Sequence, residues 1–165
     1  KEKAPSNWGE FCEPLGVTET IREGNDITIV SYGPTLRLAM DAAKQLEEVG
    51  ISAEIIDIQT LLPFDLNHSI VSSVKKTNRL LVVDEDVSGG ASAFILQQIV
   101  ETQGGFQFLD SEPKTLAAKD HRPAYGSMEI TSASRERRIF SRRRMRCCRS
   151  QILLNSRQFI NHIGP

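Results

Sequence analysis

Two patterns of hydrophobic and polar positions alternate along the first 118 residues. Three short, mostly apolar runs lie at residues 26–33, 53–58 and 79–85, and after each one the apolar residues recur every three or four positions. Runs rich in β-branched residues are typical of buried strands, and the longer spacing is typical of amphipathic helices. The pattern therefore predicts three consecutive strand–helix units.

The three predicted helices have boundaries that can be read from the sequence. The first covers residues 34–50, with Thr35 as its N-cap and Gly50 as its end; the second covers residues 66–76 after a turn at 59–65; the third covers residues 91–101 after a loop at 86–90. The residues predicted to face the core are Leu36, Ala39, Met40, Ala43 and Leu46 in the first helix and Leu66, Ile70, Val71 and Val74 in the second.

The apolar character of the strands determines the expected fold. Strands this apolar are usually covered on both faces, and alternation of strands with helices gives parallel pairing. We therefore expect an α/β fold, a three-layer αβα sandwich with a mostly parallel sheet, over roughly Gly16 to Ala118. Residues 106–110 and 114–118 are expected to add one or two short strands, and residues 16–21 to pair at an edge.

Length and composition narrow the class of protein. A chain of 165 residues suits one domain. No apolar stretch is long enough to span a membrane, and no secretory signal opens the chain. Cys12 stands alone in the body, whereas Cys147 and Cys148 are adjacent near the C-terminus, so neither a disulfide framework nor a metal cluster is predicted. A cytoplasmic location is the expectation.

Charge changes abruptly after Ser127. Nine of the 20 Lys and Arg residues lie beyond it, all of them Arg, against two of the 21 acids, so this segment carries +7 and the preceding body −8. Lys and Asp are absent from residues 128–165. An Arg-rich segment of this kind either binds the phosphate groups of a nucleic acid or is not an evolved part of the protein.

Polar residues follow each predicted strand and are the first candidates for a functional site. Ligands of open α/β sheets bind beyond the carboxyl ends of the strands. The candidates there are Gly33, Gln59, Thr60, Asp84, Glu85, Asp86, Gly89 and Gly90. Gly89-Gly90 could receive a phosphate, and the three acids could hold a metal or act in acid–base chemistry, but strand punctuation and a solvated rim or interface explain the same residues. Of the histidines, His68 is predicted at the surface and His121 is the better functional candidate.

A wider pattern resembles a known family. The segments that carry it follow one another in order: "PLGVTETIREGNDITIVSYG", "ISAEIIDIQTLLPFD", "SIVSSVKKTNRLLVVDED" and "GGASAFILQQI". They resemble the C-terminal, transketolase-like domain of the beta half of thiamine-diphosphate-dependent 2-oxo acid dehydrogenases, the first component (E1) of a multienzyme complex. The stretch "TLAAKDHRPAYGS" further resembles the fused alpha/beta, branched-chain type, such as 2-oxoisovalerate dehydrogenase. Gln59 stands where that family usually has Arg, and Asp84 where many members have His.

The resemblance implies a role in assembly within an oxidoreductase. The complete enzyme would bind thiamine diphosphate and Mg²⁺ in other domains, and this chain would bind neither and be inactive alone. Expected partners are the other E1 domains or subunits, the acyltransferase E2 and a second copy of the enzyme; neither nucleic acid nor a membrane is expected. The residues placed near an interface are Gly33, Thr60, Leu61, Pro63, Glu85, Gly89 and His121.

The same resemblance explains the Arg-rich segment. The expected continuation after Ser127 is Asp-Gly-Asp-Tyr-Phe-Ser-Lys-Pro, and it can be written in codons that, read one base later, encode Met128 to Ser134. The chain is accordingly divided into residues 1–15, a linker from an upstream domain; 16–127, the transketolase C-terminal-like domain; and 128–165, a frameshifted tail.

Two other functions compete with this interpretation. A free-standing flavodoxin-like binding module would need a phosphate-binding loop after the first strand, where "SYGPTLR" offers a single Gly. A nucleic-acid-binding protein would depend on the Arg-rich segment, which lacks Lys and interleaved aromatic residues.

Overall fold

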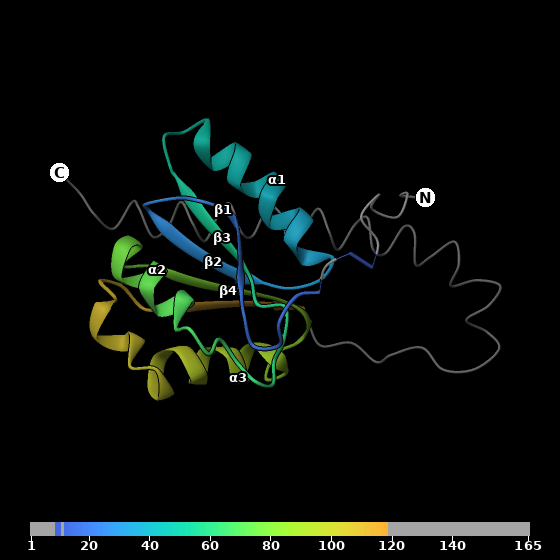
Figure 1. Ribbon diagram of the computed structural model, residues 1–165. Coiled ribbons are helices and arrows are strands. Elements are labelled where there is room, and N and C mark those ends of the chain that lie inside the picture. The colour runs from blue at the N-terminus through green and yellow to red at the C-terminus, as the bar shows by residue number, and fades with distance from the viewer. Residues whose placement is uncertain (1–8, 11, 119–165) are drawn as a thin grey trace, which may run out of the picture.

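The computed structural model describes residues 9–10 and 12–118, which form a five-stranded sheet between two layers of helices (Figure 1). The strand order is β1-β3-β2-β4-β5. β2, β3, β4 and β5 pair in parallel, and β1 pairs antiparallel with β3 at one edge. The elements are β1 (Glu19–Arg22), β2 (Ile27–Ser31), α1 (Thr35–Glu47), β3 (Ala53–Asp57), α2 (Ser69–Thr77), β4 (Leu80–Val87), α3 (Ala91–Gln97), a π-helical turn (Gln98–Thr102), a 3₁₀ turn (Gly105–Phe108) and β5 (Lys114–Ala118).

The helices cover the two faces of the sheet and create two cores. α1 lies on one face, and α2 and α3 lie on the other (Figure 1). The first core packs Ala39, Ala43 and Leu46 of α1 against Ile29 and Ile55. The second core packs Ile70 and Val74 of α2 and Ile95 of α3 against Val30 and Val82. Every residue of β2 is buried, as expected for a strand covered on both faces. The predicted three-layer sandwich with a mostly parallel sheet is confirmed.

Three local predictions were wrong. Leu66 was expected in the core, but α2 begins only at Ser69, and Leu66 is 61% exposed. Residues 106–110 were one of two candidates for one or two last strands, but of the two only residues 114–118 form a strand, and residues 105–108 form a 3₁₀ turn after Gly104, which has a left-handed φ of 68°. Thr35 was expected as the N-cap of α1, but Pro34 occupies that position and the Thr35 hydroxyl donates back to the Tyr32 carbonyl.

Several predictions concern residues outside the described part of the chain. Residues 128–165 and His121 lie outside it, as do residues 1–8 and 11 of the predicted linker. Among the described helices, none combines the length and apolar character that a membrane span requires.

Candidate functional site

The candidate residues from the sequence come together at one end of the sheet. β2, β3 and β4 are parallel, so their carboxyl ends and the loops that follow lie at the same end. Gly33 follows β2, Glu85 lies near the end of β4, and Gly89 lies in the loop before α3. Thr60, Leu61 and Pro63 come from the loop between β3 and α2. We call this region the carboxyl end of the sheet.

Asp84 connects three elements at this end. Its carboxylate is buried and accepts hydrogen bonds from the Tyr32 hydroxyl, from the Asp86 amide at 3.0 Å and from the Ser92 amide at 2.8 Å. These contacts hold the end of β4 against the end of β2 and the first turn of α3. Both carboxylate oxygens are occupied, so Asp84 serves the loop geometry and is not presented to a ligand.

The same contacts shift the ionisation of both side chains. Burial of the Asp84 carboxylate acts to raise its pKa, but the hydrogen bonds from Tyr32, Asp86 and Ser92 outweigh burial and hold the pKa below its usual value. Burial and the hydrogen bond to Asp84 raise the pKa of the Tyr32 hydroxyl. The pair is therefore a charged carboxylate and a neutral phenol at neutral pH.

The acidic run at residues 84–86 was weighed as a metal or acid–base cluster. Asp84 is buried, whereas Glu85 and Asp86 are exposed. Within residues 9–10 and 12–118, no group of three or more His, Cys, Asp or Glu side chains is placed to hold a metal ion. Glu85 and Asp86 instead form part of the solvated rim of this end of the sheet.

Gly33 and Gly89 have conformations that favour glycine. Their φ angles are 57° and 89°, in the left-handed region, and a Cβ atom at either position would have no heavy atom within 4 Å. Each glycine therefore serves the turn before a helix and leaves the surface above it open. α3 has only seven residues, so the dipole at its N-terminus is no argument for an anion-binding site there.

Thr60 ties the N-terminal segment to the loop between β3 and α2. Its hydroxyl accepts a hydrogen bond from the Gly16 amide at 2.7 Å and donates to the Pro63 carbonyl at 3.2 Å. The Gly16 carbonyl accepts from the Leu66 amide at 2.8 Å. A Cβ on Gly16 would lie 2.8 Å from Pro63 and 2.9 Å from Leu66, so the two segments are in close contact.

Asp65 fixes the other end of this loop. It is buried, and its carboxylate accepts from the Ser69 and Ile70 amides, both at 2.9 Å, which satisfies two free donors at the start of α2. This role was not predicted from the sequence, because the helix was expected to begin at Leu66, three residues before its observed start at Ser69. An Asp directly before a predicted helix was the available signal.

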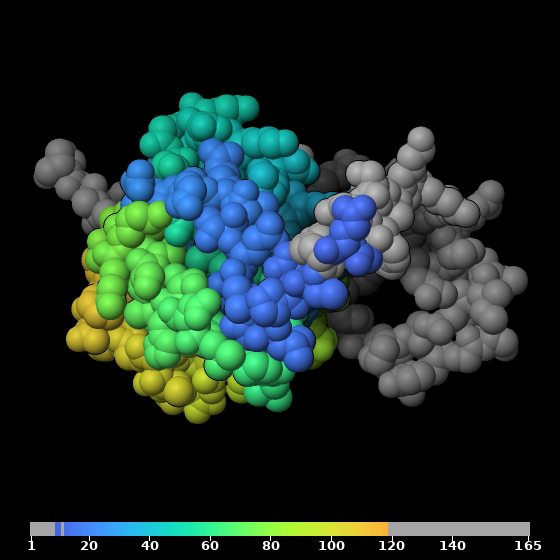
Figure 2. Space-filling model, viewed as in Figure 1, coloured from blue at the N-terminus to red at the C-terminus, as the bar shows by residue number. Residues whose placement is uncertain are grey.

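The two joined segments expose a group of leucines. Leu15 is 69% exposed, Leu61 37%, Leu62 78% and Leu66 61%. We call these four residues the leucine surface. In Figure 2 the blue N-terminal residues lie directly against the green residues of the loop. Of these residues only Leu61 was predicted to lie near an interface, although two adjacent leucines, Leu61 and Leu62, in a predicted turn were a signal for Leu62 as well.

Exposed leucines that are close together indicate an interaction surface. Water-exposed apolar groups that are close in space favour contact with another apolar surface. The geometry of the carboxyl end therefore supports an interaction surface, with Asp84, Asp65 and Thr60 holding the loops that present it.

Comparison with known proteins identifies the same domain. A family model described as "Transketolase, C-terminal domain" matches residues 16–134. The chain is 39% identical over 111 residues to the pyruvate dehydrogenase E1 component subunit beta-1, mitochondrial, of Arabidopsis thaliana, and this covers 67% of the chain and 30% of the relative. It is 35% identical over 111 residues to the 2-oxoisovalerate dehydrogenase subunit beta of Bacillus subtilis, covering 67% of the chain and 33% of the relative.

A third relative and a solved structure extend the comparison. The acetoin:2,6-dichlorophenolindophenol oxidoreductase subunit beta of Bacillus subtilis is 39% identical over 118 residues, covering 72% of the chain and 33% of the relative. The solved "Split gene transketolase, inactive beta4 tetramer" has a TM-score of 0.60 at 22% identity, covering 88% of this chain and 45% of that one, which shows a shared fold. The chain spans about a third of the length of these curated relatives.

Proposed function

The chain belongs to the transketolase C-terminal domain family, and from this premise we propose that it is the C-terminal assembly domain of the beta subunit of a 2-oxo acid dehydrogenase E1 component. Such an enzyme oxidatively decarboxylates a 2-oxo acid and passes the acyl group to the lipoyl group of E2. Relatives named as the beta subunit of the pyruvate dehydrogenase E1 component and as the beta subunit of 2-oxoisovalerate dehydrogenase support this proposal. The domain contributes to assembly, and the chemistry belongs to the complete enzyme.

The substrate is proposed at two levels. Relatives named for pyruvate, 2-oxoisovalerate and acetoin match the chain at 39%, 35% and 39% identity, so similarity in this domain does not follow the substrate. The class we propose is a 2-oxo acid, which the relatives named for pyruvate and 2-oxoisovalerate support, whereas acetoin is a hydroxyketone. Within it, the fused-type motif at residues 115–127 favours a branched-chain acid such as 2-oxoisovalerate.

The coenzyme proposed for the complete enzyme is thiamine diphosphate with Mg²⁺, and the described residues do not fit a site for it. A diphosphate–Mg²⁺ site needs oxygen ligands in a fixed arrangement. No cluster of metal-ligating side chains occurs among the described residues. The buried carboxylates of Asp65 and Asp84 already accept hydrogen bonds from backbone amides. We therefore assign the coenzyme to other domains and derive no chemical step here.

The observation that carries the proposal is the leucine surface. Its residue Leu15 is 69% exposed and lies directly before Gly16, where the match to the family model begins. We propose that the rest of the beta subunit, or the subunit paired with it, covers this surface in the complete enzyme. The remaining partners are E2 and a second copy of the enzyme, and the cytoplasmic location stays a prediction.

A chimeric subunit tests this assignment. The C-terminal third of the Bacillus subtilis 2-oxoisovalerate dehydrogenase beta subunit is replaced by residues 14–127 of this chain, which include Leu15, and the chimera is produced together with its natural partner subunit. We expect the two to co-elute in size-exclusion chromatography. A folded chimera that elutes alone, as the subunit truncated before this domain does, would contradict the proposal.

Two matched variants locate the contact. Leu62→Asp places a charge in the leucine surface, whereas Phe106→Asp places the same charge on an exposed residue, 69% accessible, in the 3₁₀ turn that follows α3. We expect the first to weaken assembly about tenfold or more, which corresponds to about 1.4 kcal/mol, and the second to leave it unchanged. Equal effects would show that the leucine surface is not the contact.

A further inference from the structure

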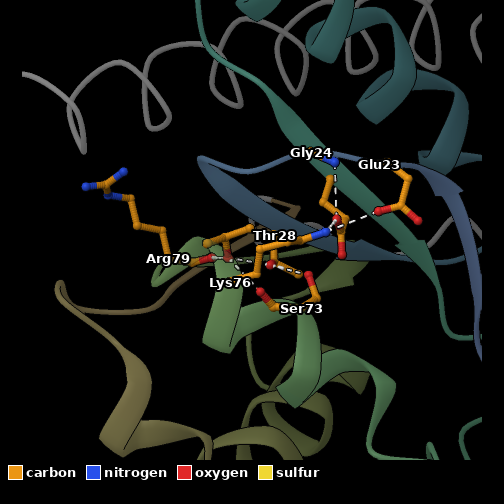
Figure 3. Close-up of polar contacts among 8 residues, drawn as sticks. Glu23, Gly24, Thr28, Ser73, Lys76 and Arg79 are labelled. Atoms are coloured by element: carbon orange, nitrogen blue, oxygen red, sulfur yellow. Dashed lines mark hydrogen bonds and ion pairs between the residues drawn. The ribbon is translucent and has the colours of Figure 1, made fainter.

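A buried carboxylate lies at the opposite end of the sheet from the leucine surface. Glu54 is in β3, and its side chain is 5% exposed. Its Oε2 accepts a hydrogen bond from the Gly24 amide at 3.1 Å and forms an ion pair with Nζ of Lys76 from α2. Lys76 also donates to Glu23, with the Lys76 Nζ 3.1 Å from Oε2 of Glu23. Figure 3 shows both contacts of Lys76. Lys76 therefore joins α2 to β3 and to the turn between β1 and β2.

Burial does not neutralise this pair. Burial acts to raise the pKa of Glu54, but the hydrogen bonds from Lys76, Ser73 and Gly24 outweigh it and hold the pKa below its usual value. The contact with Glu54 raises the pKa of Lys76. Both groups are charged at neutral pH, and removing one of them would leave the other without its partner.

The turn that receives these contacts lies directly on β3. A Cβ on Gly24 would be 2.2 Å from the carbonyl carbon of Ala53 and 2.3 Å from the amide nitrogen of Glu54. Only glycine fits there, so the turn is in contact with the β3 backbone at the position of Glu54. Any change in the Glu54 contacts therefore acts on the turn.

β1 depends on few other attachments. It has four residues, of which three are exposed, it pairs only with β3 among the described strands, and its register shifts between Thr20 and Arg22. Arg22 also forms an ion pair at 3.1 Å with Glu47 of α1, whose side chain is 68% exposed against 20% for Arg22. The Glu19 carboxylate accepts an exposed hydrogen bond from the Gln59 amide group at 3.0 Å, and exposed contacts of this kind contribute little. Short edge strands with exposed ladders belong to the regions that open most readily.

β1 connects the two ends of the sheet. Because it runs antiparallel to β3, its last residue, Arg22, lies near Glu54, and its first residue, Glu19, lies opposite Asp57 at the carboxyl end. Gly16 and Leu15 come shortly before it, and Leu15 is one of the four residues of the leucine surface. Release of β1 from the sheet would remove one attachment of the Leu15–Gly16 segment and leave it held by the hydrogen bonds of Gly16 with Thr60 and Leu66.

We propose that the Glu54–Lys76 pair holds edge strand β1 on the sheet and thereby positions Leu15, the N-terminal member of the leucine surface, at the opposite end. Glu54 and Lys76 are positioning residues: they touch no part of the leucine surface and act through β1. A contact that weakens the pair would dismantle the surface without unfolding the domain.

Amide hydrogen exchange of the full 165-residue chain, read residue by residue by NMR, tests this coupling. Lys76→Met removes the charge and keeps an apolar side chain. We expect the Gly16 and Leu66 amides to exchange about tenfold faster or more, whereas the Ile29 and Val82 amides of the central strands change by less than about threefold. The control is Lys75→Met. Lys75 lies on the same helix, but its Nζ lies over the Phe108 ring, 4.7 Å from the ring centroid, and not at Glu54.

Each result decides for or against the coupling. Unchanged exchange at Gly16 and Leu66, equal acceleration throughout the sheet, or the same effect from Lys75→Met would overturn it. If Lys76→Met does not fold, Glu23→Gln decides, because it removes only the largely exposed partner of Lys76. We then expect about threefold acceleration confined to the same two amides, and no acceleration would overturn the proposal. Hydrogen exchange detects no catalytic function, so this test is independent of the proposed E1 assignment.

Discussion

Asp84 and Tyr32 hold the carboxyl end of the sheet together through a single side-chain contact. The hydroxyl of Tyr32, at the end of β2, donates to a carboxylate that also receives two backbone amides. A buried backbone amide that keeps its hydrogen-bond acceptor costs the folded state little free energy. An amide that loses its acceptor destabilises the folded state by about 1–3 kcal/mol. The loops that carry Gly33, Glu85 and Gly89 therefore depend on the Asp84 carboxylate.

Asp84→Asn should lower the free energy of unfolding by about 1–3 kcal/mol at pH 7, because the new amide group faces donors where an acceptor is needed. The pKa of Asp84 is lowered in the folded state, so its contribution is present above the usual Asp value near 4 and is lost as the pH falls through the lower folded value. Urea titrations of variant and wild type at pH 7 and pH 3 measure the loss in free energy of unfolding and its dependence on pH. A difference between variant and wild type that grows in acid would contradict this sign.

Leu46 and Leu62 have the same side chain in opposite environments. Leu46 lies on the inner face of α1 and is fully buried, whereas Leu62 is 78% exposed. Leu46→Ala should lower the free energy of unfolding by about 2–5 kcal/mol, and Leu62→Ala by no more than about 0.5 kcal/mol. Denaturant midpoints of the two variants check this. A large loss at Leu62 would mean that the leucine surface is covered within the isolated chain.

Among the elements, the turn between β1 and β2 has the least tolerance for change. Gly24→Ala should destabilise the domain by about 1–3 kcal/mol, because the added methyl group meets the β3 backbone 2.2 Å away. Gly89→Ala is the matched control, since no atom lies within 4 Å of its Cβ and only the left-handed φ of 89° opposes it. Thermal unfolding distinguishes the two, and an equal or smaller loss at Gly24 would show that the turn moves away freely.

The elements themselves could largely be predicted from the sequence. Residues 27–31, 53–57 and 80–87 became strands because each contains β-branched and other apolar residues that are buried on both faces of a parallel sheet. Leu66 was misplaced because Asp65 caps the helix from outside its first turn. Residues 105–108 were misplaced because the aromatic alternation of Phe106 and Phe108 imitates a strand, whereas Gly105 packs against Ile99 in a tight turn.

The candidate site was less predictable, for a physical reason. The sequence brings Gly33, Thr60, Glu85 and Gly89 to one end because parallel strands end together. The contact of Tyr32 with Asp84 joins residues 52 positions apart, and it depends on the register of β2 and β4, which composition does not determine. The contact of Gly16 with Thr60 spans 44 positions and depends on the antiparallel entry of β1 in the same way.

At the scale of the whole molecule, the leucine surface should make the isolated chain self-associate. Apolar groups exposed together find the same groups on another copy when their natural cover is missing. Sedimentation velocity of the full chain should show oligomers that increase with concentration, and Leu62→Asp should shift the distribution toward monomer while Phe106→Asp does not. A clean monomer at high concentration, with no binding of a hydrophobic dye, would contradict this.

The central claim is that this chain serves as the C-terminal domain of an E1 beta subunit, and turnover by the chimeric Bacillus subtilis enzyme tests it most directly. With thiamine diphosphate, Mg²⁺ and 2-oxoisovalerate supplied, we predict that the chimera decarboxylates at least about tenfold faster than the enzyme whose beta subunit lacks this domain, and that Leu62→Asp removes most of the gain. A folded chimera that turns over no faster than the truncated enzyme would contradict the account.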